Sequence, residues 1–565
     1  MAKVISIGNQ SFESIRKDDC FYIDKTHFIK EWWENKDNVT LITRPRRFGK
    51  TLNMSMLECF FSNKYKDRGD LFEGLEIWND EKYRKLQGTY PVIFLSFAEI
   101  KQNNYNDAVE KIKRIICEVC QQFDFLKNWD GLTEIEKKNI SNISYNMSDV
   151  MAQDLIKNMS NYLSRYYGKK VIILLDEYDT PMQEAYVNGY WEELVAFTRS
   201  LFNSTFKTNP YLERAIMTGI TRVSKESIFS DLNNLKVITV TSDEYSKCFG
   251  FTEDEVFAAL DEQGLSSEKE KVKLWYDGFT FGDEKDVYNP WSIINFLDEK
   301  KYKTYWADSS SNGLVNELIR TGSAEIKKTM ETLIAGGTVE KNIDEQIVFE
   351  QLKTNKDAVW SLLLASGYLR VETFRTEGRL NKKIYSLKLT NYEVEQMFGT
   401  MIERWFGGAD VPYNEFINAM LNGDIESMNE YMNRVTRGVI SYFDTGKTPS
   451  DEEPERFYHG LVLGLMVEQV DNYILNSNRE SGYGRYDIML EPIDKTNEKY
   501  PGIVIEFKVI NPRKENTLEE TVAAALKQIE EKNYDAELVK RGVKEENIHH
   551  YGFAFRGKEV LIDGR

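Results

Sequence analysis

Short apolar runs alternate with longer amphipathic stretches between residues 38 and 240. Continuous runs rich in β-branched residues and leucine are typical of a parallel sheet that is buried on both faces. The amphipathic stretches between them have the pattern of crossover helices, so this part of the chain is predicted to be an α/β domain. Its predicted strands are VTLIT (39–43), VIFLSF (92–97), VIILL (171–175), AIMTGI (215–220) and, more weakly, VITVT (237–241).

Helical patterns dominate after about residue 250, in FTEDEVFAALDEQG, NPWSIINFLDEKK and NGLVNELIRT. The stretch DAVWSLLLASGYLRVETFRTEGRLNKKIYSLKL then predicts a helix and two strands joined by a glycine-containing turn. This unit could be a winged-helix element, but we favour a small α+β connector whose charges are only solvated. The basic residues of its hairpin are Arg370, Arg375, Arg379, Lys382 and Lys383.

A polar, acidic and proline-containing segment, TGKTPSDEEPE (445–455), is predicted to be a linker. Helix ERFYHGLVLGLMVEQVDNYIL, strands around RYDIML and GIVIEF, and helix LEETVAAALKQIEEKNY follow it. At roughly 100–200 residues per domain, a chain of 565 residues is expected to hold two to four domains. We expect an α/β domain over 1–250, a mostly helical connector over 251–445 and a second α/β domain over 446–565.

The composition is that of an ordered globular protein, with 41% hydrophobic and 29% charged residues. Neither a signal-peptide pattern nor a run of ~18 apolar residues is found, so we expect a cytoplasmic protein with no membrane segment. Five cysteines suit a reducing compartment. The pair Cys117 and Cys120 lies in a helical pattern, and packing in a core explains it better than metal or redox chemistry.

A formal net charge of −18 argues against non-specific coating of nucleic acid, because phosphate repels a net-acidic surface at long range. A nucleic-acid partner would need local basic patches. The four histidines are scattered along the chain, so a zinc site is not expected. Any metal is expected to be held by carboxylates.

The first candidate site is RPRRFGKT (44–51), which lies between the predicted strand VTLIT and a predicted helix. Backbone N–H groups at a strand-to-helix turn bind phosphate, while a lysine adds charge and a Ser or Thr hydroxyl binds magnesium. Gly49, Lys50 and Thr51 meet these requirements. Arg44, however, stands where the usual pattern has its first glycine, and a GKT triplet alone would be a chance match.

Other segments supply further candidates for the same chemistry. Arg46 and Arg47 could contact phosphate or a neighbouring subunit, or could simply be surface residues. In VIILLDEYD a buried strand ends at Asp176 and Glu177, where one carboxylate can hold magnesium through water and the next can orient or deprotonate the attacking water. Their order along the chain is that of an ATPase of the additional-strand type.

The segment AIMTGITRVS places polar residues at the end of another predicted strand. Thr218 or Thr221 could sense the γ-phosphate, and Arg222 could act as an arginine finger. A helix cap at Thr221 and a solvated side chain at Arg222 fit the pattern as well.

The second candidate site lies near the C-terminus, in RYDIMLEPIDKTNEKYPGIVIEFKVI. If the two apolar segments form a hairpin, Asp487 falls opposite Glu506, and Lys508 shares the face of Glu506 because residues i and i+2 point the same way. Two adjacent carboxylates repel each other unless a cation lies between them, which indicates a magnesium site. Lys508 could then orient water or stabilise charge on a phosphate. A surface hairpin with a salt bridge would also explain the pattern.

Taken together, these motifs resemble bacterial and archaeal AAA-ATPase-like proteins fused to a C-terminal PD-(D/E)XK nuclease domain. Members of that family carry Arg-Pro-Arg-Arg ahead of GKT, so Arg44 belongs to the family's version of the loop. The segments that carry the resemblance are DCFYIDKTHFI, TRPRRFGKTLNMSML, ILLDEYDTP, MTGITRVSKESIFSDLNN, WYDGFTFGDEKDVYNPWSI, SNRESGYGRYDIML and IVIEFKV.

The resemblance implies roles for individual residues. In the first domain Lys50 and Thr51 would bind phosphate and magnesium, and Asp176 and Glu177 would serve ATP hydrolysis. In the last domain two residues would bind metal, a lysine would be catalytic and a glutamine would position the site; these are Asp487, Glu506, Lys508 and Gln528. Tyr486 replaces the family's proline. A glutamate on the preceding helix often assists, and Glu455 is our choice with Glu468 as its rival.

We therefore expect a P-loop ATPase domain, a helical lid or connector, and a nuclease-like domain over the three ranges given above. The cofactors would be ATP and Mg2+, with Mn2+ as an alternative at the nuclease site. The expected substrate is nucleic acid, DNA rather than RNA, in defence or DNA processing, with a homo-oligomer formed through the ATPase domain. The alternative is a nucleotide-dependent switch whose nuclease-like domain only docks a partner. The basic residues near the second site are Arg479, Arg485, Lys508, Arg513 and Lys514.

Overall fold

The computed structural model describes most of the chain. The described residues are 3–221, 228–229, 232–307, 315, 318–319, 324–334, 336–344, 358–378, 382–406, 414–439, 472–477, 480–481, 484–497, 499–511, 515–556 and 559–565. Most of the predicted helix NGLVNELIRT, the predicted linker and nearly all of the helix predicted after it lie outside these ranges. The described end of that last helix prediction is wrong, because residues 473–475 belong to strand β12 (Tyr473–Ser477), which pairs with β15 (Ile488–Pro492).

A five-stranded parallel sheet forms the centre of the N-terminal part, as the apolar runs predicted. Its order is β2-β3-β4-β1-β5, so β4 is inserted between β1 and β3. The weakest predicted strand is an edge strand that ends earlier than expected, and its residues are less buried than those of its neighbours. The strands are β1 (Val39–Thr43), β2 (Val92–Ser96), β3 (Val171–Asp176), β4 (Leu212–Gly219) and β5 (Leu235–Ile238).

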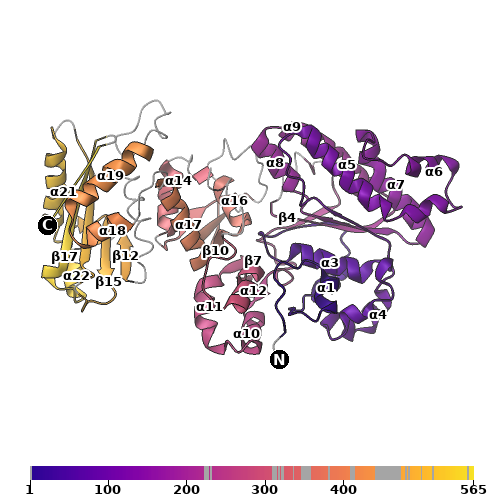
Figure 1. The fold of residues 1–565 in the computed structure, drawn as a ribbon, viewed down its shortest axis with the longest axis horizontal. Coiled ribbons are helices and arrows are strands. Elements are labelled where there is room, and N and C mark those ends of the chain that lie inside the picture. Colours follow the sequence, from indigo (N-terminus) through magenta and orange to yellow (C-terminus); the bar gives the residue numbers. More distant parts are fainter. Residues whose placement is uncertain are drawn as a thin grey trace. The chain divides into compact units, whose positions relative to one another are not determined.

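Helices cover both faces of this sheet (Figure 1), which explains why its strands are continuously apolar. On one face lie α1 (Phe12–Lys17), α2 (His27–Asn35), α3 (Lys50–Phe61) and α4 (Glu81–Leu86), which share a hydrophobic core with β1 and β3. The other face carries α5 (Tyr105–Gln121), α7 (Asp149–Tyr167), α8 (Thr180–Asn188) and α9 (Trp191–Phe202), with α6 (Glu134–Ser141) beyond them. Cys117 and Cys120 are buried in α5, in agreement with core packing.

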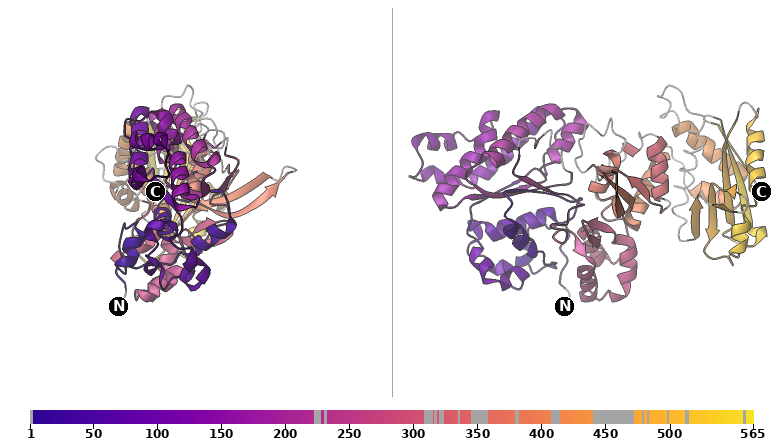
Figure 2. Two further views of the ribbon diagram at one scale, coloured as in Figure 1. Left: turned by 90° about the vertical axis from the view of Figure 1, so that its right-hand side faces the viewer. Right: turned by 180° about the vertical axis from the view of Figure 1, so that it is seen from behind.

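The middle of the chain contains helices and two small sheets. The first group comprises α10 (Glu253–Glu262), α11 (Lys269–Tyr276), α12 (Pro290–Glu299) and the sheet of β6 (Phe251–Thr252), β8 (Glu284–Tyr288) and β7 (Phe279–Phe281). The predicted helix and hairpin are α16 (Ala358–Ala365), β10 (Leu369–Glu377) and β11 (Lys382–Leu389). Strand β9 (Val339–Lys341) pairs with β11 as the third strand of this sheet. The hairpin projects beyond the helices around it (Figure 2, left view).

Further helices precede the C-terminal sheet. They are α14 (Ala324–Ile334), α17 (Tyr392–Phe406), α18 (Asn414–Leu421) and α19 (Ile425–Val439).

The C-terminal part is built on a mixed five-stranded sheet of order β12-β15-β16-β17-β18. Alternate side chains of β15 and β16 serve two cores. Ile488 and Ile505 pack in the core that contains α18 and α19, whereas Met489 and Val504 pack in the core that contains α21 and α22. The elements are β12 (Tyr473–Ser477), β13 (Glu480–Ser481), β14 (Gly484–Arg485), β15 (Ile488–Pro492), β16 (Gly502–Val509), α21 (Leu518–Lys532), α22 (Ala536–Lys540), β17 (Ile548–Arg556) and β18 (Glu559–Gly564).

The chain divides into two compact units. The first comprises residues 1–311 and 340–393, and the second comprises 312–339 and 394–565. The predicted division into three domains stays a prediction. Among the residues that the structure describes, no helix combines the length and the apolar composition needed to cross a membrane.

Candidate functional site

The segment between β1 and α3 has the backbone of an anion-binding turn. Gly49 precedes the first residue of α3 with φ 77°, and Arg47 also has a positive φ of 65°. Arg44 does not have a positive φ, so the first position of the loop does not require a glycine. Because the parallel strands end at one edge of the sheet, the loop lies beside the ends of β3 and β4.

The side chain of Arg44 points into the protein and not toward the loop. Its guanidinium donates to the carbonyl oxygens of Thr43 at 2.9 Å and Thr239 at 2.7 Å, and it lies 4.5 Å from the ring centroid of Phe281. The residue is fully buried, and burial lowers the pKa of its guanidinium to about 10. Arg44 therefore anchors the start of the loop to the residues that follow β5.

Lys50 folds its ammonium back onto the same loop. Its Nζ donates to the carbonyl oxygens of Arg44 at 3.0 Å and Pro45 at 2.9 Å. Burial lowers the pKa of Lys50, and the carboxylates of Glu177 and Asp176 oppose this shift. The loop thus holds the buried ammonium of Lys50, which can attract a phosphate group. The carboxylates of Glu177 and Asp176 lie near this ammonium.

Asp176, the last residue of β3, accepts hydrogen bonds from hydroxyl groups of two other elements. Thr51 Oγ1 of α3 donates to Asp176 Oδ2 at 2.7 Å, and Thr218 Oγ1 of β4 donates to Asp176 Oδ1. Burial raises the pKa of Asp176, while these two hydrogen bonds lower it. A hydroxyl and a carboxylate oxygen in contact are ligands that Mg2+ accepts. The structure therefore brings Thr51, Asp176 and Thr218 together.

Glu177 lies in a strained backbone conformation beside this group. Its φ is 50°, which is uncommon for a residue with a side chain. Its N–H donates to Thr218 Oγ1 at 3.4 Å and its Oε2 accepts from Thr180 Oγ1 at 3.1 Å. Glu177 also lines the cavity above the loop. A carboxylate that orients or deprotonates an attacking water needs this location.

Asp179 is a functional candidate that sequence reasoning missed. Its Oδ2 accepts from the backbone N–H groups of Ile220 at 3.0 Å and Thr221 at 2.8 Å, and from Thr221 Oγ1 at 2.9 Å. A Cβ at Gly219 would lie 2.7 Å from Asp179 Oδ1, so only glycine allows this approach. The sequence signal that could have identified it is its place as the third acidic residue of DEYD (176–179). Thr221 is therefore held by Asp179 and does not share the contacts of Thr218.

The two remaining loop arginines also line the cavity. Arg46 reaches Gln183 Oε1 at 3.5 Å, and its carbonyl oxygen accepts from Trp306 Nε1 at 3.0 Å. The guanidinium of Arg47 lies 4.1 Å from the ring centroid of Trp291. Arg222 lies outside the described residues.

A cavity of about 700 Å³ opens above the loop. Part of its wall comes from residues 5–25, and the motif DCFYIDKTHFI, to which the sequence assigned no role, supplies the last of these residues. Another part comes from α12 and the turn before β6. The wall residues that are distant in sequence from the loop include Ile5, Asn9, Phe21, Tyr22, Ile23, Lys25, Cys248, Phe251, Trp291 and Ile294.

In the C-terminal unit, the register of β15 and β16 agrees with the predicted hairpin. Ile488 pairs with Ile505 and Met489 with Val504, which puts Asp487 level with Glu506. Asp487 Oδ2 accepts from the backbone N–H of Phe507 at 2.8 Å. Asp487 thus lies directly beside the strand that carries Glu506.

A glutamine of α21 links the other members of this site. Lys508 Nζ donates to Gln528 Oε1 at 2.6 Å, and Gln528 Nε2 donates to Glu506 Oε1 and, at 3.2 Å, to the hydroxyl of Tyr534. All of these side chains lie on the sheet face covered by α21. The structure therefore brings Asp487, Glu506, Lys508 and Gln528 together, and Tyr534 is a neighbour that the sequence did not indicate.

The oxygen-rich donor set of this site suits a hard cation such as Mg2+. Within the described residues no cluster of three or more histidine, cysteine or carboxylate side chains is arranged to hold a metal ion. Metal binding by Asp487 and Glu506 stays a prediction. Glu455 and Glu468 lie outside the described residues, as do Arg479, Arg513 and Lys514. Arg485 is described by its backbone alone, in β14.

Comparison with known proteins finds a family match for one region at each end of the chain. Residues 6–229 match the family model described as Predicted AAA-ATPase, and residues 453–564 match the model of the PD-(D/E)XK nuclease superfamily. The uncharacterized protein in vnfD 5'region of Azotobacter chroococcum mcd 1 is 25% identical over 396 residues, which is 70% of this chain and 68% of that protein. The resemblance found in the sequence is therefore confirmed, while the role of each residue stays a prediction.

Proposed function

We propose that this chain, in which an AAA-ATPase-like region is joined to a PD-(D/E)XK nuclease superfamily region, binds and hydrolyses ATP and cleaves nucleic acid phosphodiesters, DNA in preference to RNA. ATP at the first site controls the second. A role in defence or DNA processing follows from this pairing by analogy of fold.

The convergence of Thr51 and Thr218 on Asp176 supports the ATPase half. Lys50 and the N–H groups of the loop would hold the phosphates, while Thr51 and Asp176 would hold Mg2+. The ion, when bound, neutralises charge that develops on the phosphates. Glu177 would accept a proton from the attacking water at its carboxylate, which faces the cavity.

The hydrogen-bonded row of Lys508, Gln528 and Glu506 supports the nuclease half. Asp487 and Glu506 would hold Mg2+ or Mn2+, which lowers the pKa of a bound water and neutralises phosphate charge. Gln528 fixes the ammonium of Lys508, so that this ammonium can donate to a phosphate oxygen or to water. Phosphodiester cleavage requires this positioning more than it requires a covalent intermediate.

The deciding experiment measures cleavage of end-labelled single-stranded DNA, double-stranded DNA and RNA with Mg2+ or Mn2+, with and without ATP. We expect Lys508→Ala to abolish cleavage, with a loss of at least ~100-fold, and Lys50→Ala to abolish the effect of ATP on cleavage. Lys495→Ala is a matched control, because Lys495 lies in the loop between β15 and β16 and pairs with Glu491 at 2.8 Å.

Cleavage that persists in Lys508→Ala would contradict the assigned site. If the wild type binds ATP but cleaves no substrate, the alternative of a nucleotide-dependent switch with a docking domain replaces the nuclease.

A further inference from the structure

The cavity above the phosphate loop has a wall that begins far from the loop in sequence. Residues 5–25 form an N-terminal segment, and several of its side chains line the cavity opposite Gly49, Lys50 and Thr51. A wall made of a separate segment must be held in place by contacts of its own. Lys25, at the end of this segment, makes a buried ion pair that holds it.

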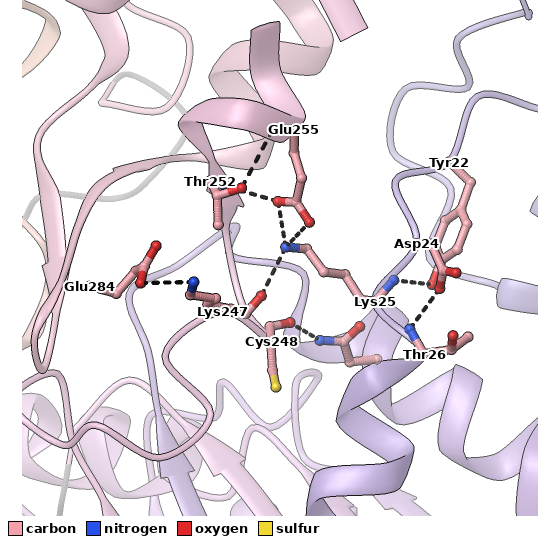
Figure 3. Close-up of polar contacts among 10 residues, drawn as sticks. Tyr22, Asp24, Lys25, Thr26, Lys247, Cys248, Thr252, Glu255 and Glu284 are labelled. Atoms are coloured by element: carbon pink, nitrogen blue, oxygen red, sulfur yellow. Dashed lines mark hydrogen bonds and ion pairs between the residues drawn. The ribbon is translucent and has the colours of Figure 1, made fainter. Parts of the chain in front are cut away.

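Lys25 is 5% exposed, and its ammonium makes hydrogen bonds to two other residues (Figure 3). Its Nζ donates to both carboxylate oxygens of Glu255, at 2.8 and 2.7 Å, and to the carbonyl oxygen of Lys247 at 2.9 Å. An ammonium has three N–H donors, so these contacts satisfy all of them. The N-terminal segment is thereby joined to the turn before β6 and to α10.

Glu255 is itself fixed at the start of α10. Its Oε2 accepts from the N–H of Thr252 at 2.7 Å, and its own N–H donates to Thr252 Oγ1 at 3.4 Å, a reciprocal capping box. The carboxylate therefore holds the helix start and Lys25 at the same time. Moving Lys25 away would release the cavity wall from a fixed point of α10.

The same turn is tied to the helix of the phosphate loop. Asn53 Nδ2 of α3 donates to the carbonyl oxygen of Cys248 at 2.8 Å. Gly250 has φ 82°, and a Cβ there would lie 2.6 Å from Val287 and 3.0 Å from Phe48 of the loop. Residues 247–252 thus contact the phosphate loop on one side and Lys25 on the other.

Fold stability alone is a weak reason for this arrangement. Removing two charges from water is costly, and an apolar pair of similar size often stabilises a protein equally well. Burial lowers the pKa of Lys25, and the charge of Glu255 opposes the shift. An ion pair differs from an apolar contact in being directional. This one fixes Lys25 of the cavity wall to Glu255, a residue behind the wall at the start of α10.

We propose that Lys25 and Glu255 form a latch that fixes the N-terminal segment to α10, so that this segment and the turn before β6 stay closed around the bound nucleotide. The latch rests on the proposed ATP binding and goes beyond it by assigning nucleotide retention to residues outside the phosphate loop. Both side chains are positioning residues. Opening the latch speeds nucleotide release and leaves the hydrolytic groups Asp176 and Glu177 in place.

The experiment measures dissociation of a fluorescent ATP analogue by stopped flow, together with kcat at saturating ATP. We expect Lys25→Met and Glu255→Gln each to speed dissociation at least ~10-fold, while kcat changes less than ~2-fold. The exchanged pair Lys25→Glu with Glu255→Lys should recover part of the retention that Lys25→Glu alone loses. Glu253→Gln is the matched control, because Glu253 lies on α10 like Glu255 but pairs with Lys273 of α11 and makes no ion pair with the N-terminal segment.

Thermal unfolding without nucleotide checks that each variant is folded, and Glu255→Gln and the exchanged pair serve if Lys25→Met does not fold. Unchanged dissociation in a folded Lys25→Met or Glu255→Gln protein would overturn the latch alone. Failure of the wild type to bind the analogue would overturn the proposed ATP binding and the latch with it.

Discussion

Single side chains decide how the phosphate loop of this protein is built. Arg44 replaces a glycine at a position where the backbone does not require one, and its guanidinium spans to the segment after β5. Arg47, three positions later, has φ 65° and stacks on Trp291. Arginine therefore anchors the loop to the protein interior at position 44. At position 47 it occupies a backbone conformation that is unfavourable for a residue with a side chain.

Arg44→Gly, which restores the usual loop pattern, is expected to destabilise the first unit by roughly 2–4 kcal/mol, because buried carbonyl groups lose their donors and a cavity remains. Arg47→Gly, the matched control, relieves a left-handed backbone and loses one stacking contact, so its change should stay within about 1 kcal/mol. Urea unfolding followed by circular dichroism measures both. Equal losses in the two variants would contradict an anchoring role for Arg44.

At the scale of elements, the first turn of α17 supports the loop through a short chain of contacts. Glu393 accepts from the N–H of Trp306 at 2.6 Å and from Ser292 Oγ at 2.8 Å. The indole of Trp306 then donates to the carbonyl oxygen of Arg46. Burial raises the pKa of Glu393 to about 7, so its protonation is coupled to the packing of three elements around the loop.

A carboxyl whose pKa is higher in the folded than in the unfolded state favours folding when protonated. The first unit should therefore lose stability as the pH rises from about 4.5 to about 7, by roughly 3 kcal/mol for this group. Glu393→Gln should flatten that dependence, measured as the thermal midpoint across the same pH range. Asp277, whose pKa is also raised to about 7, titrates in both proteins and cancels in the comparison. Parallel profiles would contradict the assignment to Glu393.

At the scale of the molecule, each of the two units carries one of the two candidate sites, in an acidic chain of net charge −18. The C-terminal sheet is held by apolar cores on both faces. Its site carboxylates already have protein donors, since Phe507 N–H binds Asp487 and Gln528 binds Glu506. Folding of this unit therefore does not depend on a metal, whereas the proposed cleavage does.

Removal of divalent ions with EDTA is expected to abolish cleavage and to shift the thermal midpoints by less than ~2 °C, because a weakly held ion contributes little to folding. Re-addition of Mg2+ or Mn2+ should restore cleavage. Activity assays and differential scanning calorimetry on the same sample measure the two effects. A cooperative loss of the C-terminal transition on chelation would show instead that the metal is structural.

Local patterns were sufficient for the strands of the parallel sheet and for the β15–β16 hairpin, and they missed β12, β17 and β18. Apolar runs located β1 and β3, and the alternation of i and i+2 put Glu506 and Lys508 on one face of β16. The hairpin register followed from matching the two apolar segments, which put Asp487 beside Glu506. These features depend on periods of a few residues and on strand ends meeting at one sheet edge, so they can be read without coordinates.

The tertiary structure alone decided which loops meet. Arg44 anchors through residues that follow β5, Asp179 holds Thr221 at the end of β4, and Lys25 reaches Glu255 of α10. No period or short motif encodes such contacts, because they depend on how elements separated by long stretches of chain pack in three dimensions. The sequence by itself therefore determined the parallel strands, the β15–β16 hairpin and the candidate residues of the two sites, and tertiary packing determined the residues that hold and enclose them.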